Sequence, residues 1–174
     1  MAKNYDFSNL RILVVEDNNF MRLMIQRILE SFEITDINIA RDAYDGFEAA
    51  KSFMPDLIIS DWDMEPGDGL TLLDWIRNRP DSPDKYMPII MLTGYSESKR
   101  VLQARDFGVN EFLAKPVTAQ ALYSRLASVV ENPRSYVRAG DFFGPDRRRR
   151  EEEDFDGENR RSNKDIYDID PAKG

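Results

Sequence analysis

The sequence contains no cysteine and no histidine among its 174 residues. The absence of cysteine excludes a disulfide framework and a thiolate metal site. The absence of histidine removes the commonest zinc ligand, the Ser-His-Asp triad and any phosphohistidine within the chain itself. Any chemistry must therefore rest on carboxylates, lysine, arginine and hydroxyl groups.

Long hydrophobic runs are also missing, and none approaches the roughly 20 residues that a helix needs to span a bilayer. Residues 1–11 include no apolar segment of the kind found in secretory signals. The formal net charge is -8, which argues against general affinity for nucleic acid or for an anionic membrane. We expect a soluble cytoplasmic protein that does not insert into membranes.

Short apolar runs alternate with amphipathic stretches between Leu10 and about Val130. The runs predict five strands, at residues 11–15, 36–40, 57–60, 88–92 and 111–114. The stretches between and after them predict five helices, at about residues 21–29, 43–53, 70–78, 96–107 and 118–131. This alternation predicts an α/β fold, a doubly wound five-stranded parallel sheet with helices on both faces.

Charged and hydroxyl side chains follow the expected strands at their carboxyl ends. Glu16 and Asp17 follow the first strand, Asp61 the third, Thr93 the fourth and Lys115 the fifth. These ends meet at one edge of a parallel sheet, where doubly wound folds bind ligands. The three carboxylates suit Mg²⁺, which prefers oxygen ligands. Asp61 could then act as a nucleophile toward a phosphoryl group whose oxygens Lys115 and Thr93 would stabilise.

Four sequence blocks resemble those of the response-regulator receiver family, the CheY-like proteins. They cover residues 12–18, 55–64, 91–94 and 112–116, in the order and spacing of that family. The resemblance extends over about residues 10–131. It implies the flavodoxin-like (βα)5 form of the fold, and a histidine kinase or phosphorelay protein as the partner that supplies the phosphoryl group.

The resemblance also implies roles for individual carboxylates. Asp61 would be the phosphoacceptor, and Asp61 and Asp17 would ligate Mg²⁺ directly. The backbone carbonyl of Asp63 would be a third ligand, and Glu16 would assist through water. The alternative is a degenerate receiver that is never phosphorylated.

A switching pair is implied in the same way. Thr93 would turn toward the phosphoryl group, and the ring of Phe112 would move into the space that Thr93 leaves. Phe112 could instead be an ordinary packing residue, and Trp62 could either plug its loop or face a partner. Pro116 would follow a cis peptide bond.

One loop departs from the family pattern. The family often has proline directly after the methionine that follows the acceptor, whereas this sequence has Glu65 there and Pro66 one residue later. Residues 67–69 keep the glycine-rich turn into the next helix. Asp63 and Tyr95 occupy positions that tune dephosphorylation in the family.

The pattern changes after residue 131, which divides the chain into a receiver domain at 1–131 and a C-terminal tail at 132–174. The tail has no sustained periodicity and its charges are blocked. Residues 134–150 hold six arginines and two aspartates, and residues 151–158 hold six acidic residues and no basic one. Because so polar a segment cannot bury enough apolar surface to fold alone, we expect it to be disordered unless a ligand orders it.

A weak repeat within the tail relates residues 143–148 to residues 155–161. Each copy has an aromatic residue, a glycine, an acid or amide, and then paired arginines. These residue types suit guanine, because arginine pairs with its O6 and N7, a carboxylate accepts from its N1 and N2 hydrogens, and an aromatic ring stacks on its face. The remaining arginines could hold phosphates. A ligand with two guanines and two phosphates would match both copies.

Residues 136–150 resemble the tail of an alphaproteobacterial group of CheY-like proteins, the Cle group. This resemblance implies that the tail binds cyclic di-GMP and that the receiver docks on the flagellar motor switch protein, which would recruit it to the flagellar pole. The residues so implied in cyclic di-GMP binding are Tyr136, Arg138, Phe143, Asp146, Arg147, Arg148, Arg149, Arg150, Asn159, Arg160 and Arg161.

Other interpretations of the tail remain open at this point. Its arginines could form only transient ion pairs with the neighbouring acids, or could contact an acidic protein partner. A tether to nucleic acid or membrane is opposed by the acidic residues 151–154, which would repel a long polyanion. The alternative to the cyclic di-GMP adaptor is a plain phosphorelay receiver with the tail as a solvated appendage. In neither case is the chain an enzyme, because the site transfers phosphate only to itself.

Overall fold

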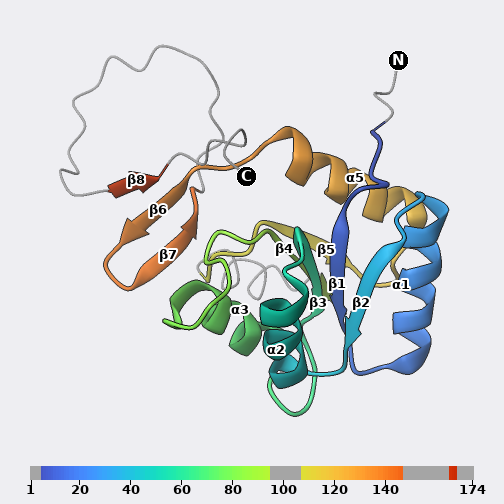
Figure 1. The fold of residues 1–174 in the computed structure, drawn as a ribbon, viewed down its shortest axis with the longest axis horizontal. Coiled ribbons are helices and arrows are strands. Elements are labelled where there is room, and N and C mark those ends of the chain that lie inside the picture. The colour runs from blue at the N-terminus through green and yellow to red at the C-terminus, as the bar shows by residue number, and fades with distance from the viewer. Residues whose placement is uncertain (1–4, 95–106, 147–164, 168–174) are drawn as a thin grey trace.

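The computed structural model describes residues 5–94, 107–146 and 165–167 (Figure 1). Five parallel strands form its central sheet in the order β2-β1-β3-β4-β5. The strands are β1 Arg11–Val15, β2 Asp36–Ala40, β3 Leu57–Asp61, β4 Ile89–Thr93 and β5 Glu111–Ala114. The predicted doubly wound sheet is confirmed, and its strand order reverses at β1 and β3.

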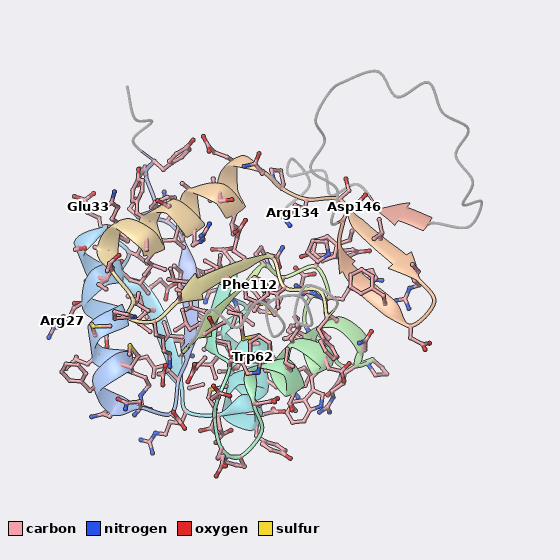
Figure 2. The ribbon with its side chains drawn as sticks, turned by 180° about the vertical axis from the view of Figure 1, so that it is seen from behind. Arg27, Glu33, Trp62, Phe112, Arg134 and Asp146 are labelled. Carbon is pink, nitrogen blue, oxygen red and sulfur yellow. The ribbon has the colours of Figure 1, made fainter. Side chains whose placement is uncertain are left out.

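Helices cover both faces of this sheet. Those in the described residues are α1 Asn19–Ser31, α2 Ala43–Phe53, α3 Gly69–Asn78 and α5 Ala119–Glu131. Helices α1 and α5 lie on one face and α2 and α3 on the other (Figure 1); Arg27 of α1 points away from the sheet (Figure 2). The helix expected at about 96–107 falls almost entirely outside the described residues. No helix in the described part of the chain is long and apolar enough to cross a bilayer.

Short polar side chains begin these four helices. Asn18, Asp42, Asp68 and Thr118 each accept a hydrogen bond from a backbone amide in the first turn, at 2.8 to 3.2 Å. Such N-caps typically stabilise a helix by about 0.5–2 kcal/mol. In a parallel α/β fold they also place the helix N-termini next to the carboxyl ends of the strands, where the functional residues were expected.

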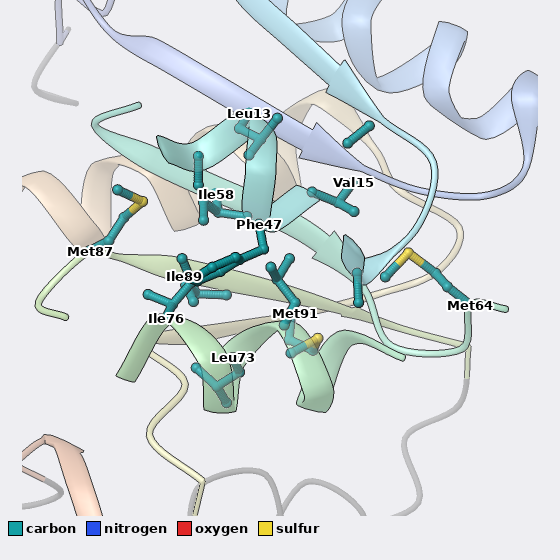
Figure 3. Close-up of a cluster of buried hydrophobic side chains, with 14 of the residues drawn as sticks. Leu13, Val15, Phe47, Ile58, Met64, Leu73, Ile76, Met87, Ile89 and Met91 are labelled. Atoms are coloured by element: carbon teal, nitrogen blue, oxygen red, sulfur yellow. The ribbon is translucent and has the colours of Figure 1, made fainter. Parts of the chain in front are cut away.

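The core has two layers because successive residues of a strand point to opposite faces. On β1, Leu13 and Val15 belong to the cluster that packs against α2 and α3 (Figure 3). Ile12 and Val14, between them, belong to the cluster under α1 and α5. All four side chains are fully buried, so the sheet is covered on both faces and gives the site a rigid base.

A second, antiparallel sheet follows α5. Strand β6 Tyr136–Ala139 pairs with β7 Phe142–Pro145 through a turn at Gly140, which has a φ of 60°. Strand β8 Asp165–Tyr167 pairs with the other edge of β6. The expectation that the tail is disordered without a ligand is therefore wrong for residues 136–145. These residues pack against the receiver, where Tyr136 and Phe143 are each only 2% exposed.

The hairpin of β6 and β7 packs beside α3 and the amino-terminal ends of β4 and β5. The hydroxyl of Tyr136 donates to the carbonyl of Tyr86 at 2.6 Å and accepts from the amide of Asn110 at 3.1 Å. The buried guanidinium of Arg77 lies 5.3 Å from the Tyr136 ring and donates to the carbonyl of Gly108. The division of the chain into two domains at residue 131 stays a prediction, but the two parts share a packed interface.

Candidate functional site

Three carboxylates meet where the order of the strands reverses. Asp61 is the last residue of β3, and Glu16 and Asp17 directly follow β1. One carboxylate oxygen from each residue lies within 4.8 Å of the other two. Glu16 and Asp61 are buried, whereas Asp17 is exposed and opens the cluster to solvent. The structure thus brings together the acidic residues that the sequence pattern predicted.

Lys115 supplies the positive charge of the site from the end of β5. Its Nζ lies 2.8 Å from Asp61 Oδ1 and 3.1 Å from Glu16 Oε2. Its backbone amide donates to the carbonyl of Thr93 at 2.8 Å, which ties the residue to the adjacent strand β4. The predicted proximity of Lys115 and Asp61 is therefore present in the structure.

The pKa values of these groups reflect burial and crowding. Burial raises the pKa of Asp61 above its ordinary value, against the effect of Lys115. Burial and the charge of Asp61 together raise the pKa of Glu16. Burial lowers the pKa of Lys115, but its bonds to Asp61 and Glu16 outweigh this effect, so that the net shift is upward. The buried carboxylates therefore hold their negative charge at a cost that an additional cation would relieve.

The donor set fits Mg²⁺. Glu16 Oε2 is a buried oxygen with no hydrogen bond of good geometry, although Lys115 Nζ is near it. A hard cation bound by oxygen ligands and several waters would satisfy this oxygen and reduce the repulsion among the carboxylates. Glu16, Asp17 and Asp61 would hold the ion. The backbone carbonyl of Asp63, whose side chain is exposed, stays a predicted further ligand.

Thr93 and Phe112 lie on neighbouring strands and on the same face of the sheet. The register of β4 and β5 pairs Thr93 with Ala114, so these two side chains lie on the same face. Phe112 is two residues before Ala114 on β5 and therefore lies on that face as well. Thr93 is 7% exposed, and the half-buried ring of Phe112 packs against the cluster of α2 and α3. This placement suits a switching pair, and the movement itself stays a prediction.

Helix α3 begins unusually close behind Asp61. A Cβ atom on Gly69, the first residue of α3, would lie 2.2 Å from the carbonyl oxygen of Asp61, so only glycine fits there. The amide of Gly69 donates to the carbonyl of Trp62 at 2.9 Å. Trp62 itself is 6% exposed and belongs to the core cluster, so of its two expected roles the structure supports the plug.

Two peptide bonds near the site are cis. One is the expected bond between Lys115 and Pro116. The other joins Glu65 and Pro66, at the position where the sequence departs from the receiver pattern. The altered loop is evident in the sequence, whereas the conformation of this bond is not.

The residues expected to bind cyclic di-GMP separate into three groups. The rings of Tyr136 and Phe143 are buried in the interface with the receiver, 5.2 and 5.5 Å from the ring of Tyr86. Arg138 is exposed on β6, and Asp146 follows β7 with its amide bonded to the Ser135 carbonyl at 2.7 Å. The third group lies outside the described residues: Arg147, Arg148, Arg149, Arg150, Asn159, Arg160 and Arg161.

The burial of Tyr136 and Phe143 corrects their expected role. As stacking platforms for guanine they would need an exposed ring face, but in the docked hairpin both rings serve packing. Arg77 and Asn110 contact the hairpin from the receiver side and were not predicted from the sequence. A signal for Arg77 was present, because it stands four residues after Leu73 and so lies on the buried face of α3.

Comparisons with known proteins agree with this geometry. The family model of the response regulator receiver domain matches residues 12–127. The chemotaxis protein CheY of Pseudomonas aeruginosa is 30% identical over 123 residues, which cover 70% of this chain and 97% of that protein. The chemotaxis protein CheY-3 of Vibrio cholerae is 29% identical over 123 residues, covering 71% and 93%.

Solved structures show the same similarity. A putative response regulator from Chloroflexus aurantiacus has a TM-score of 0.65 at 25% identity, over 71% of this chain and 98% of that one. The chemotaxis response regulator CheY4 of Vibrio cholerae has a TM-score of 0.63 at 25% identity, over 69% and 98%. The similarity thus spans nearly the full length of these proteins and leaves part of the present chain unmatched.

Proposed function

We propose that this chain, which belongs to the response regulator receiver family and signals by phosphorylation, is a CheY-like adaptor with two inputs. The first input is a phosphoryl group on Asp61, and the second is cyclic di-GMP bound to the arginine-rich tail. The observation that carries the first input is the contact of Lys115 Nζ with Asp61 Oδ1 at 2.8 Å, beside the carboxylates of Glu16 and Asp17. The second input rests on the blocked charges of residues 134–158.

In the proposed phosphorylation, a carboxylate oxygen of Asp61 attacks the phosphorus of a phosphohistidine in a kinase or relay protein. The new O–P bond forms as the P–N bond breaks, and the imidazole of the partner leaves with the electron pair of that bond. Lys115 stabilises the negative charge of the phosphoryl oxygens from its place beside Asp61. Bound Mg²⁺ would add positive charge at the same oxygens.

Thr93 and Phe112 would transmit the modification. The hydroxyl of Thr93, at the end of β4, would donate a hydrogen bond to a phosphoryl oxygen on Asp61. Its rotation would open space on the face of the sheet that it shares with Phe112, whose ring is only half-buried and can move. The new charge would thereby change the surface around β5.

Phosphorylation can be tested with an acyl phosphate as the donor. Intact-mass measurement after incubation with acetyl phosphate and Mg²⁺ should show one phosphoryl adduct on the wild-type chain. Asp61→Asn should abolish the adduct, and Asp45→Asn, an exposed substitution on α2, should retain it. Equal labelling of Asp61→Asn and the wild type would place the phosphoacceptor elsewhere.

The tail supplies the second proposed input. Arg138 is exposed on the hairpin, and Arg147 follows the end of β7 by two residues in the sequence. Arginine forks suit both phosphates and the O6 and N7 atoms of guanine. We exclude Tyr136 and Phe143 from the binding set because both are buried. The proposed set therefore consists of Arg138, Asp146, Arg147, Arg148, Arg149, Arg150, Asn159, Arg160 and Arg161.

Calorimetric titration of the full chain with cyclic di-GMP tests this input. Arg147→Ala and Asp146→Ala should each weaken binding strongly while acetyl phosphate still labels Asp61. Arg27→Ala is the matched control, because Arg27 is exposed on α1, on the opposite side of the molecule from Arg134 and Asp146 (Figure 2). Unchanged affinity in both tail variants would remove the tail from the binding site.

The output we propose is docking on the flagellar motor switch protein, with recruitment from the cytoplasm to the flagellar pole. The similarity to chemotaxis proteins supports this output. In the described part of the chain, no effector domain accompanies the matched receiver region. Co-precipitation of a motor switch protein should increase when cyclic di-GMP is added to the wild type. The same increase with Arg147→Ala would show that docking does not depend on cyclic di-GMP binding by the tail.

A further inference from the structure

A pocket of about 250 Å³ lies between the hairpin and the carboxyl end of α5. It opens beside the amino-terminal ends of β4 and β5, at the opposite end of the sheet from Asp61. Figure 2 shows Arg134 in the chain that connects α5 to the hairpin. The residues that line the pocket include Tyr86, Pro88, Glu111, Val129, Pro133 and Arg134.

The walls of this pocket suit a flat, apolar-faced ligand. Pro88, Val129 and Pro133 contribute apolar surface from three separate segments, and Tyr86 adds an aromatic ring. The Tyr86 ring is held edge-to-face, 5.2 Å from Tyr136. Small-molecule sites are typically concave, mostly apolar and provided with few polar groups that set orientation.

Glu111 is a polar group in this wall that retains capacity to accept hydrogen bonds. Its Oε1 accepts from the hydroxyl of Ser128 at 2.9 Å and lies 3.5 Å from Arg134 Nη2. Its Oε2 has Arg125 Nη1 as a neighbour at 3.6 Å, an ion pair that is too long for a hydrogen bond. Since a carboxylate oxygen has two lone pairs, Oε2 can accept from a ligand.

Asn110 contributes to the wall but is committed to the fold. Its Oδ1 accepts from Arg77 Nη2 at 3.0 Å and from the Ile89 amide at 2.9 Å. Its Nδ2 donates to the Tyr136 hydroxyl at 3.1 Å. These bonds fix the amide orientation, so Asn110 is less suited than Glu111 to accept hydrogen bonds from a ligand.

The charges around the pocket favour a hydrogen-bond donor over an anion. Asp84 and Glu111 are both in the lining, against the single guanidinium of Arg134. A phosphate placed there would meet two carboxylates. An uncharged planar ring with adjacent N–H donors on one edge would instead bond to Glu111.

Guanine has that edge. Its N1–H and N2–H groups point the same way and can pair with one carboxylate, whereas adenine offers one amino group and an acceptor nitrogen there. We propose that the pocket between the hairpin and α5 binds a guanine base through Glu111. This inference rests on the proposed function, in which cyclic di-GMP provides the base.

The position of the tail agrees with this assignment. The amide of Asp146 donates to the Ser135 carbonyl at 2.7 Å, which holds the end of the hairpin next to Arg134 at the pocket. The arginine run starts at the following residue of the sequence. A base in the pocket would therefore leave its phosphate outside, near the covalent start of that run and away from Asp84 and Glu111.

Calorimetry with the full chain and cyclic di-GMP is the first test. Glu111→Gln should weaken binding about tenfold or more, because one member of a paired carboxylate contact is lost. Glu30→Gln, which also removes one negative charge but lies on α1, should bind as the wild type does. Val129→Phe, which narrows the pocket and keeps Glu111, should weaken binding as well. Affinity equal to that of Glu30→Gln in both pocket variants would overturn the proposal.

NMR titration with guanosine tests the pocket without the dinucleotide. Guanosine should shift the backbone amides of Glu111, Ser128 and Val129, and adenosine at the same concentration should shift them far less. If guanosine shifts these amides but the wild type fails to bind cyclic di-GMP, the proposed cyclic di-GMP input is refuted and the guanine pocket is supported. If the wild type binds cyclic di-GMP but neither cyclic di-GMP nor guanosine shifts these amides, the guanine pocket is refuted and the cyclic di-GMP input stands.

Discussion

Arg77→Met is expected to destabilise the protein strongly, because the guanidinium of Arg77 is buried and acts as the centre of the interface that receives the hairpin. The residue is 2% exposed and donates five hydrogen bonds. Its acceptors are the carbonyls of Lys85, Met87 and Gly108 and the side chain of Asn110. Methionine would keep the apolar stem of the side chain and remove all five donors.

The magnitude follows from the acceptors that lose a partner. Asn110 Oδ1 keeps the amide of Ile89 as a donor, so the main loss falls on the three carbonyls. A buried acceptor without a partner costs about 1–3 kcal/mol. Burial also lowers the pKa of Arg77, which means that the charged side chain is itself costly to bury, and its removal offsets part of the loss. We expect a net destabilisation of about 2–4 kcal/mol.

Urea unfolding followed by far-UV circular dichroism measures this quantity. With a slope of about 2 kcal/mol per molar urea, in the middle of the usual range, the midpoint should fall by about 1–2 M. Arg27→Met is the matched control, since that side chain is 72% exposed and its ion pair with Glu30 is worth about 0.5 kcal/mol or less. A midpoint shift for Arg77→Met no larger than that of the control would refute the role of the buried guanidinium.

Three further predictions concern the acidic pocket and the hairpin. Burial raises the pKa of Asp61 in the folded protein above its value in the unfolded chain. Protonated Asp61 therefore contributes stability below a pH of about 4, and this contribution is lost as the pH rises through the pKa of the folded state. In metal-free buffer the thermal midpoint of the wild type should therefore fall between mildly acidic and neutral pH more than that of Asp61→Asn; parallel profiles would contradict this. Millimolar Mg²⁺ should raise the wild-type midpoint at pH 7 and raise that of Asp17→Asn less, by the mass-action effect of a ligand that binds the folded state; equal rises would remove Asp17 from the site. Gly144→Ala would place a Cβ atom 2.6 Å from the Cα of Gly108, so amide exchange in β6 should accelerate while that in β1 stays unchanged, and unchanged exchange in β6 would show that the interface tolerates the side chain.

Much of the fold and of the phosphorylation site was predictable from the sequence. The alternation of apolar runs and amphipathic stretches predicts parallel strands, and the carboxyl ends of parallel strands meet at one edge. Glu16, Asp17, Asp61 and Lys115 stand at or just after the carboxyl ends of strands, so their convergence follows from topology alone. The local reason is that each position is set by the end of its own strand and needs no knowledge of distant side chains.

The hairpin was not predictable in this way. Residues 136–145 form two four-residue strands within a charged segment, and an isolated hairpin of this size is at best marginally stable in water. Tyr136 becomes a core residue because Tyr86 and Asn110, 50 and 26 residues earlier in the chain, supply its hydrogen-bond partners.

The sequence by itself determined the parallel sheet and the acidic site at its carboxyl edge, because both depend on patterns within short segments. Only the tertiary structure decided that the rings of Tyr136 and Phe143 are buried in packing, and that a pocket with Glu111 in its wall lies beside them. The physical reason is that burial and pocket shape depend on which surfaces meet. At the hairpin those surfaces come from α3, β5 and α5, far away along the chain.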